Sequence, residues 1–576
     1  MSEYRIDELS VGQLKRIKIP PFQRGFVWTR KKQEDFVQTL HDGYPFGTLL
    51  VYPENDNDKD SLLLLLDGQQ RLSTIRKYQD NPLSFWKPLN REKYSEAYGK
   101  VNEALSESAQ LTEAEFDSIV SDPGWTRWLL TADMVDKASG SLQIYDLISN
   151  LNASIKEYVD LEQLKIPMIV YLGSEDHIAD VFANLNKGGV PLSKYEVFSA
   201  AWVGATIQLE PAEESVLQDR ILQNVKNYYL DKKKEAEFDL ASFSEDDLTQ
   251  SRVVSLPEFG TALGQFIVDN LPALVPNTSS AAQELGFGLL GVAEGLDNRK
   301  LNTLNTYRDD IQNSLEDILQ KTERICNNLQ SMFDALLRRF KATGNDYENG
   351  LSATFKTLSY FAALWDFDPS SEEYRKALSN IKAYYVYDAI TSAWSSHGDQ
   401  RLLEFCNGKR DYNSKIEVEN FRRAFDHWIG DQTPGINFSK EIKCLVTIHA
   451  NLSYLSASVP NGESFELEHI IARKRIDSVD NPKSRRILGG SLGNCMYLPK
   501  TDNNAKKTKT LYDVNGHGQY SQLIVDSQYF TEEDMAAAGR MLESHDFEGI
   551  NGLLKDRSRR VAYTLVDSLL AGVIKS

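Results

Sequence analysis

The segments FELEHIIARKRID (residues 465–477) and LGGSLGNCMYLPKTDNNAKKTKTL (residues 488–511) hold the densest group of chemically useful side chains in this 576-residue chain. FELEHII has the apolar pattern of a strand, with Glu468 and His469 side by side. Adjacent strand residues point to opposite faces, so these two side chains cannot serve one ligand through a regular strand. They meet at one site only if the strand ends or bends at this point.

Two asparagines and a group of lysines complete this part of the sequence. Asn494 follows His469 by 25 residues, and Asn503 follows Asn494 by nine. Residues 466–513 contain ten Lys and Arg against six Asp and Glu, a net charge of +4, whereas the whole chain has 64 − 83 = −19. The segment is therefore a local basic patch in an acidic chain, as nucleic-acid contact requires. Three lysines follow the second asparagine: Lys506, Lys507 and Lys509.

Residues 465–511 resemble the HNH (ββα-metal) nuclease motif, in the variant with asparagine at its last position. The resemblance implies that the catalytic residues are His469, Asn494 and Asn503. His469 would be the general base for water, and Asn494 would orient its imidazole through its backbone or side chain. The resemblance also implies that Glu468 and Asn503 hold one Mg²⁺ or Mn²⁺. The residue types suit phosphodiester hydrolysis, because imidazole titrates near neutral pH and oxygen ligands suit hard cations. The lysines expected to contact DNA phosphates are Lys506, Lys507 and Lys509.

One residue departs from the motif of many family members, which carry Asp-His-Ile-x-Pro. This chain has Glu468-His469-Ile470-Ile471-Ala472 at the same place, and the longer acid changes the expected metal geometry. The alternative interpretation of the segment is a buried strand histidine beside an unrelated polar loop.

A second group of residues lies near the N-terminus, in IPPFQRGFVW (residues 19–28) and LLDGQQRLSTI (residues 65–75). The second string predicts a leucine strand that ends at Asp67-Gly68, followed by a helix. The N–H groups at a helix N-terminus attract phosphate, and arginine binds phosphate oxygens in bidentate fashion. The residues expected to bind a nucleotide are Gln23, Arg24, Asp67, Gly68, Gln69, Gln70 and Arg71.

Together with FANLNKGGVPLSKYEVFSA (residues 182–200), these strings resemble the ParB/sulfiredoxin-like domain that occurs with an HNH domain in GmrSD-type, modification-dependent restriction enzymes. The resemblance covers residues 5–205 and implies binding and hydrolysis of GTP, ATP or another NTP, and sensing of modified DNA. The alternative is structural, with Arg24, Asp67 and Arg71 forming an internal salt-bridge network.

The whole sequence predicts an α+β multidomain protein. We expect a ParB-like α/β domain in residues 1–205, a helical connecting region in 206–405, and an HNH domain within a helical surround in 406–576. Near the N-terminus, strands are expected at 47–52 and 62–66 and a helix at 31–40. GFGLLG (residues 286–291) fits GxGxxG but follows a helical stretch, so it is interpreted as a chance match. The longest apolar run has six residues, which predicts a cytoplasmic protein without a membrane span.

The predicted function is an NTP-regulated, metal-dependent DNA endonuclease that nicks or cleaves modified phage DNA in antiviral defence. The expected substrate is double-stranded DNA with hydroxymethyl- or glucosyl-cytosine or a phosphorothioate backbone, and the chain is expected to form a homodimer. Three alternatives stay open. They are a modification-independent antiviral nuclease, a nucleotide-dependent DNA-binding regulator with an inactive HNH domain, and an RNA-cutting toxin.

Overall fold

A computed structural model describes residues 4–19, 28–53, 61–173, 205–234, 245–339, 346–455, 464–514 and 522–571, together with Tyr195, Phe198 and Trp202. Its contacts divide the chain into two compact units. Unit 1 comprises Met1–Val203 and Lys226–Gln250, and unit 2 comprises Gly204–Val225 and Ser251–Ser576. Both contain helices and strands, which confirms the predicted α+β class. The predicted three-part division of the chain stays a prediction.

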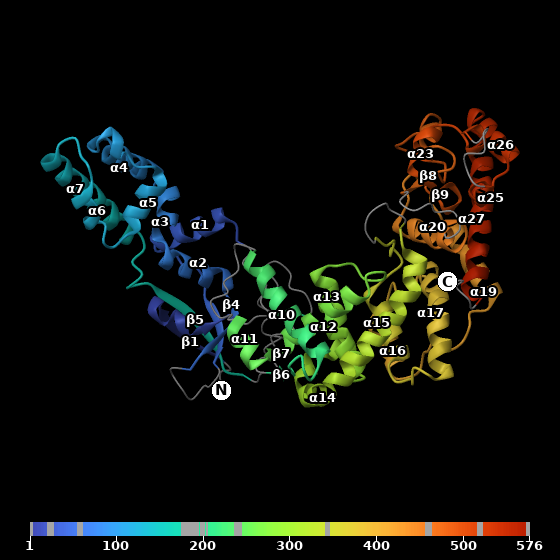
Figure 1. Ribbon diagram of the computed structural model, residues 1–576, viewed down its shortest axis with the longest axis horizontal. Helices are drawn as coiled ribbons and strands as arrows, with labels where there is room; N and C mark the ends of the chain where they lie inside the picture. The colour runs from blue at the N-terminus through green and yellow to red at the C-terminus, as the bar shows by residue number, and fades with distance from the viewer. Residues whose placement is uncertain are drawn as a thin grey trace. The chain divides into compact units, whose positions relative to one another are not determined.

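Unit 1 contains a mixed five-stranded sheet in the order β1-β5-β3-β4-β2 (Figure 1). The central strand β3 is parallel to β5 and antiparallel to β4. The outer strand β1 is antiparallel to β5, and β2 is parallel to β4. The bounds are β1 Tyr4–Ser10, β2 Ile17–Lys18, β3 Leu49–Pro53, β4 Leu63–Asp67 and β5 Lys165–Tyr171. The two strands expected at 47–52 and 62–66 are thus confirmed.

Two helices of twelve residues cover this sheet, α1 (Arg30–His41) and α2 (Gln69–Asp80). Apolar residues on one side of each helix join a core with the strands, as the helical period requires. Core members from the helices and strands are Val37, Leu65, Leu72, Ile75 and Val170. The helix expected at 31–40 is confirmed as α1.

A separate helical group in unit 1 has its own core (Figure 1). Aromatic and aliphatic side chains fill it, among them Trp86, Tyr94, Phe116, Ile144 and Ile148. No helical group was predicted from the sequence for residues 82–156. Its helices are α3 Pro82–Leu89, α4 Arg91–Ala104, α5 Glu113–Ser121, α6 Thr126–Thr131 and α7 Lys137–Lys156.

Residues 206–225 and 251–455 of unit 2 are mostly helical, with one short antiparallel pair, β6 (Thr206–Gln208) and β7 (Val253–Ser255). GFGLLG lies inside the buried helix α13 (Ser279–Ala293), so it forms no nucleotide-binding turn. Other long helices are α12 Leu256–Asn270, α15 Leu315–Leu337, α16 Thr354–Leu364, α17 Glu372–Ile390, α18 Gly398–Cys406, α19 Val418–Gly430 and α20 Lys440–Leu452.

The last part of unit 2 contains a small antiparallel strand pair, β8 (Phe465–His469) and β9 (Cys495–Pro499), followed directly by helix α23 (Lys500–Lys506). Helix α20 and the C-terminal helix α27 (Phe547–Leu570) pack beside this pair, and Figure 1 shows them next to β8 and β9. Among the described residues, no helix combines the length and apolar character that crossing a bilayer requires.

Candidate functional site

Strand β8 presents two carboxylates on one face and the histidine at its end. Glu466 and Glu468 are two residues apart, so they share a face of the strand. His469 is the last residue of β8 and pairs with Cys495 of β9. The strand therefore ends at the predicted pair, one of the two conditions under which Glu468 and His469 serve one site.

Helix α23 brings two polar side chains onto the carboxylate face of β8. Asn503 Nδ2 donates to Glu466 Oε2 at 3.2 Å, and Lys506 Nζ donates to Glu468 Oε1 at 3.1 Å. The same ammonium donates to the backbone carbonyl of His469 at 2.8 Å. Asn503 and Lys506 are three residues apart, so one helix face supplies both contacts.

Lys506 is a buried side chain, whereas Lys507 and Lys509 are exposed. Burial lowers the pKa of Lys506, and the charge and hydrogen bond of Glu468 oppose this shift. The ammonium is thus bonded inside the site. Of the three lysines expected to contact DNA, Lys507 and Lys509 are the ones on the surface.

The imidazole of His469 is held by a backbone carbonyl and an aromatic ring. Its Nε2 lies 2.8 Å from the carbonyl of Ile436, and its ring stacks on Phe438 with centroids 4.1 Å apart. Burial lowers the pKa of His469, which favours the neutral ring. A bond to a carbonyl requires the proton on Nε2, which leaves Nδ1 as the basic nitrogen.

Asn494 is fully buried and bonds to the backbone that follows His469, not to its imidazole. Its Oδ1 accepts from Ile471 N at 2.7 Å, and its Nδ2 donates to the carbonyls of Ile471 and Gly489 at 3.2 and 2.8 Å. Its own carbonyl accepts from Ile470 N at 3.0 Å. Asn494 therefore fixes the direction in which the chain leaves β8, and any effect on the imidazole passes through the backbone.

Arg557 of α27 supports the same loop, and the sequence analysis did not single it out. Its guanidinium Nη1 donates to the carbonyls of Leu492 and Cys495 at 2.8 and 3.1 Å. Burial lowers the pKa of Arg557 to about 10, so it stays charged at neutral pH. At Gly493 an added Cβ would lie 1.8 Å from the carbonyl oxygen of Leu554 in α27, so only glycine fits here. Both contacts join residues that are far apart in the sequence, so no local sequence pattern indicates them.

The side chains on the carboxylate face suit a hard divalent cation. Glu468 and Asn503 offer a carboxylate and an amide oxygen, and magnesium sites use one or two carboxylates with several waters. The ammonium of Lys506 on Glu468 shows that positive charge is stabilised at this place. In the described ranges, His, Cys, Asp and Glu side chains form no group of three or more placed to hold a metal ion. Water molecules would therefore have to complete the coordination.

Five of the N-terminal candidate residues, Asp67, Gly68, Gln69, Gln70 and Arg71, lie at the turn between β4 and α2. Gly68 has φ +101°, a left-handed conformation that favours glycine, and an added Cβ would lie 2.5 Å from Leu49 Cδ2. Arg71 Nη2 bonds to Asp67 Oδ2 at 2.8 Å and to the carbonyl of Thr48 at 2.9 Å. The strand, the glycine turn and the helix expected from LLDGQQRLSTI are thus present.

The glutamines of this turn have different surroundings. Gln69 is buried, and Gln70 Oε1 accepts from the backbone N–H of Trp28 at 2.8 Å. Gln23 and Arg24 lie outside the described residues. The Asp67–Arg71 pair is the part of the alternative salt-bridge network that the described residues contain. The Nε of Arg71 is buried and has no hydrogen-bond partner among the described residues.

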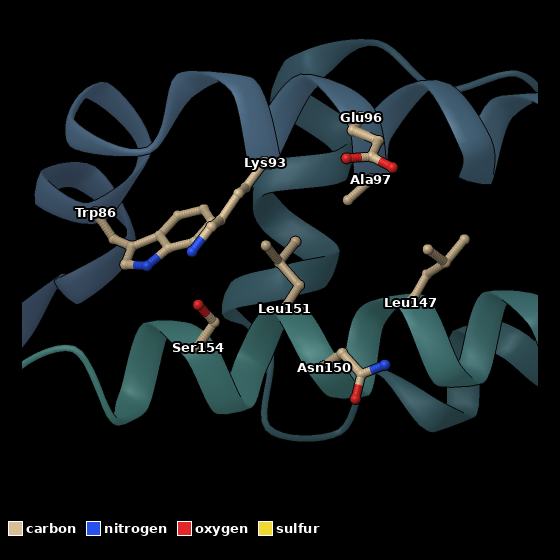
Figure 2. A pocket seen from close by; sticks show the side chains of 8 residues that line it. All are labelled: Trp86, Lys93, Glu96, Ala97, Leu147, Asn150, Leu151 and Ser154. Carbon is tan, nitrogen blue, oxygen red and sulfur yellow. The ribbon is translucent and has the colours of Figure 1, made fainter.

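An open pocket of about 300 Å³ lies between α4 and α7 in unit 1, with Trp86 of α3 at one end (Figure 2). Its wall is apolar at Ala97, Leu147 and Leu151, and it contains none of the predicted site residues. The indole Nε1 of Trp86 is buried without a hydrogen-bond partner in the part of the chain that the structure describes. The remaining lining side chains are polar: Lys93, Glu96, Asn150 and Ser154.

Comparison with known proteins bears on the N-terminal region. Residues 6–203 match the family model described as GmrSD restriction endonuclease, N-terminal domain. The chain is also 24% identical over 230 residues to an uncharacterized protein of Methanocaldococcus jannaschii, a match that covers 32% of this chain and 38% of that relative. The N-terminal region is therefore similar to the N-terminal domain of GmrSD restriction endonucleases, which supports a GmrSD-like restriction enzyme.

Proposed function

We propose that this protein is an NTP-regulated, metal-dependent endonuclease that nicks or cleaves modified phage DNA. The observation that carries the proposal is the set of contacts around His469. The similarity of the N-terminal region to GmrSD restriction endonucleases supports it. The Nε2 of His469 is bonded to a backbone carbonyl, so Nδ1 is basic, and this residue ends the strand that bears Glu468. The strand–strand–helix order of β8, β9 and α23 supports the HNH assignment.

In the proposed reaction, Nδ1 of His469 takes a proton from the water that attacks the phosphodiester. The Ile436 carbonyl holds the ring in the required tautomer, and stacking on Phe438 restrains its orientation. Glu468 and Asn503 would hold Mg²⁺ or Mn²⁺, which supplies charge stabilisation at the phosphate and the leaving oxygen. Asn494 and Arg557 keep the β8–β9 connection in the shape that places these groups.

The proposed nucleotide site is the β4–α2 turn. The N–H groups of Gln69 and Gln70 open a helix, and the partial positive charge there favours phosphate. Arg71 lies in the same turn and would exchange its contact with Asp67 for a phosphate oxygen, while Asp67 would hold Mg²⁺ or position a water. The nucleotide is GTP, ATP or another NTP in this proposal, and its hydrolysis regulates cleavage.

Purified full-length protein tests this function on modified and unmodified phage DNA, with Mg²⁺ and with or without GTP or ATP. We expect cutting of the modified DNA in the presence of Mg²⁺, and a change in rate when the nucleotide is added. Equal cutting of both DNAs would remove the modification-sensing part of the proposal. Cutting of neither, under all nucleotide conditions, would remove the endonuclease itself.

A nucleotide-dependent DNA-binding regulator is the second candidate, and one contact favours it. The ammonium of Lys506 bonds to Glu468, the residue expected to ligate the cation. A permanently occupied carboxylate would leave the nuclease inactive. The same DNAs in a gel-shift assay separate the two candidates, since a regulator binds DNA in response to nucleotide without cutting it.

A further inference from the structure

Lys506 is buried, so it is placed neither to contact DNA nor to serve as an ordinary surface lysine. Lys506 is fully buried at the end of α23. Its Nζ lies 3.1 Å from Glu468 Oε1 and 2.8 Å from the His469 carbonyl oxygen. Both partners belong to the two residues that the proposed function uses as metal ligand and base. The side chain therefore crosses from the helix to the centre of the proposed site.

The remaining charges on this face explain why a cation is needed there. Glu466 and Glu468 lie on the same strand face, so two carboxylates concentrate negative charge there. Lys500 Nζ is 3.6 Å from Glu466 Oε1, at an exposed position. Lys506 is the cation at the buried end, and desolvation makes its attraction to Glu468 stronger than that of an exposed pair.

A divalent cation and this ammonium compete for the same carboxylate. A magnesium ion bound to Glu468 Oε1 would lie about 2.1 Å from that oxygen, and Lys506 Nζ lies 3.1 Å from it. The two cations would then be at most about 5 Å apart in a buried site. Because like charges at that distance repel strongly, the long lysine stem moves away when the metal binds.

We infer that Lys506 is an internal counter-ion that holds Glu468 in the metal-free protein and is displaced when a divalent cation binds. The inference rests on the proposed function, because it takes Glu468 as a metal ligand. It makes Lys506 a positioning residue: it acts through Glu468 and keeps the ligand in place until the cation arrives. The displaced amine then leaves its buried position.

Lysine acetylation of the unmodified full chain tests the displacement directly. The protein is treated with an amine-acetylating reagent with and without Mn²⁺, in the absence of DNA, and modified lysines are located by mass spectrometry. We expect Mn²⁺ to raise acetylation of Lys506 by at least about fivefold, because the amine leaves its buried position, while the exposed Lys474 shows no change. Equal labelling of Lys506 with and without Mn²⁺ would overturn the inference.

Mn²⁺ affinity of variants provides the second measurement, by titration followed with electron paramagnetic resonance. Lys506→Met removes the competing charge and keeps the apolar stem, so we expect Mn²⁺ to bind at least about tenfold more tightly, the equivalent of one charge-assisted hydrogen bond. Lys506→Arg keeps the charge and should retain the affinity of the unmodified protein. Lys474→Met, at an exposed lysine outside the proposed site, is the matched control and should not change it.

Weaker Mn²⁺ binding by Lys506→Met would mean that the lysine only supports the fold, and would overturn the inference. Glu468→Gln should abolish the tighter binding in the Lys506→Met background; if tight binding persists, the competition is at another site and the inference is wrong. These readouts need no DNA cleavage. The replacement of Lys506 by Mn²⁺ at Glu468 is therefore tested separately from the proposed function. A regulator that never cuts DNA can show this replacement, and an active nuclease can lack it.

Discussion

The two candidate sites each contain a carboxylate paired with a cation, and the pairs differ in burial. At the β4–α2 turn, Asp67 and Arg71 meet at 2.8 Å with 39% and 25% of their side chains exposed. On β8 and α23, Glu468 and Lys506 meet at 3.1 Å with 18% and 1% exposed. The first pair lies within one turn, whereas the second joins a strand to a helix 38 residues further along the chain.

This difference determines what each pair is able to do. A partly exposed pair of this kind separates at smaller cost than a buried one, because water and salt already weaken the attraction. The arginine is therefore free to bind a phosphate. A buried ammonium leaves its carboxylate only if another cation replaces it, since an isolated buried charge is costly. The N-terminal pair is suited to an anionic ligand, and the C-terminal pair to a cationic one.

Breaking the buried pair should produce the largest change in stability. Glu468→Ala leaves the Lys506 ammonium without its carboxylate, so we expect a loss of about 3 kcal/mol in local stability. Hydrogen exchange of peptides from β8 and α23 measures it. The double variant Glu468→Ala/Lys506→Met should recover most of the loss. A change below about 1 kcal/mol in the single variant would show that burial does not distinguish the two pairs.

Acid should affect unit 2 through a different buried residue, His449 of α20, whose Nε2 lies 3.1 Å from the Tyr529 hydroxyl. Burial lowers its pKa to about 3, so its contribution is fully present above the unfolded pKa of 6.5. It is lost as the pH falls from there toward 3, because the unfolded chain takes up the proton first. At pH 5 the loss is about 2 kcal/mol at 1.36 kcal/mol per pH unit. Thermal unfolding at pH 7 and pH 5 should show a smaller difference for His449→Gln than for the unmodified protein.

The exposed pair should show the smallest effect on stability and a clear effect on nucleotide chemistry. Arg71→Ala should change the free energy of unfolding by less than about 1 kcal/mol, the range of surface ion pairs. It should lower nucleotide hydrolysis at least about tenfold, since a charged hydrogen bond to phosphate is lost. Lys31→Ala, which breaks the exposed Lys31–Asp35 pair on α1, is the matched control and should leave hydrolysis unchanged. Unchanged turnover in Arg71→Ala would contradict its phosphate role.

Local patterns predicted the elements around both sites but not the contacts between distant elements. The leucine strand, Gly68 and α2 followed from residues adjacent in sequence, and all three are present. Lys506 and Lys507 look alike in a lysine-rich string, yet the helical period turns Lys506 toward β8 with Asn503 and leaves Lys507 in solvent. If residues 500–506 are taken as a helix, the three-residue spacing puts Asn503 and Lys506 on one face. That face can meet the strand face of Glu466 and Glu468, so this contact could have been predicted.

Other features had no local signal. Arg557 supports a loop more than 60 residues away in sequence, and the Ile436 carbonyl that fixes the His469 tautomer comes from the segment before β8. Backbone carbonyls carry no residue identity, so a sequence pattern cannot reveal them as partners. The separate core of α3–α7 could not be predicted either. Apolar spacing indicates that a segment is helical, but it does not indicate which other segments the helix packs against.

The most direct test of the central claim compares DNA cleavage and nucleotide hydrolysis in one variant, His469→Ala. Removing the proposed general base should lower Mg²⁺-dependent cutting of modified DNA at least about 100-fold, the lower range for acid–base catalysis. NTP hydrolysis by the same preparation should persist at the rate of the unmodified protein, because the proposed function assigns that chemistry to the β4–α2 turn. Cleavage that survives in His469→Ala, or a joint loss of cleavage and hydrolysis, would contradict the account.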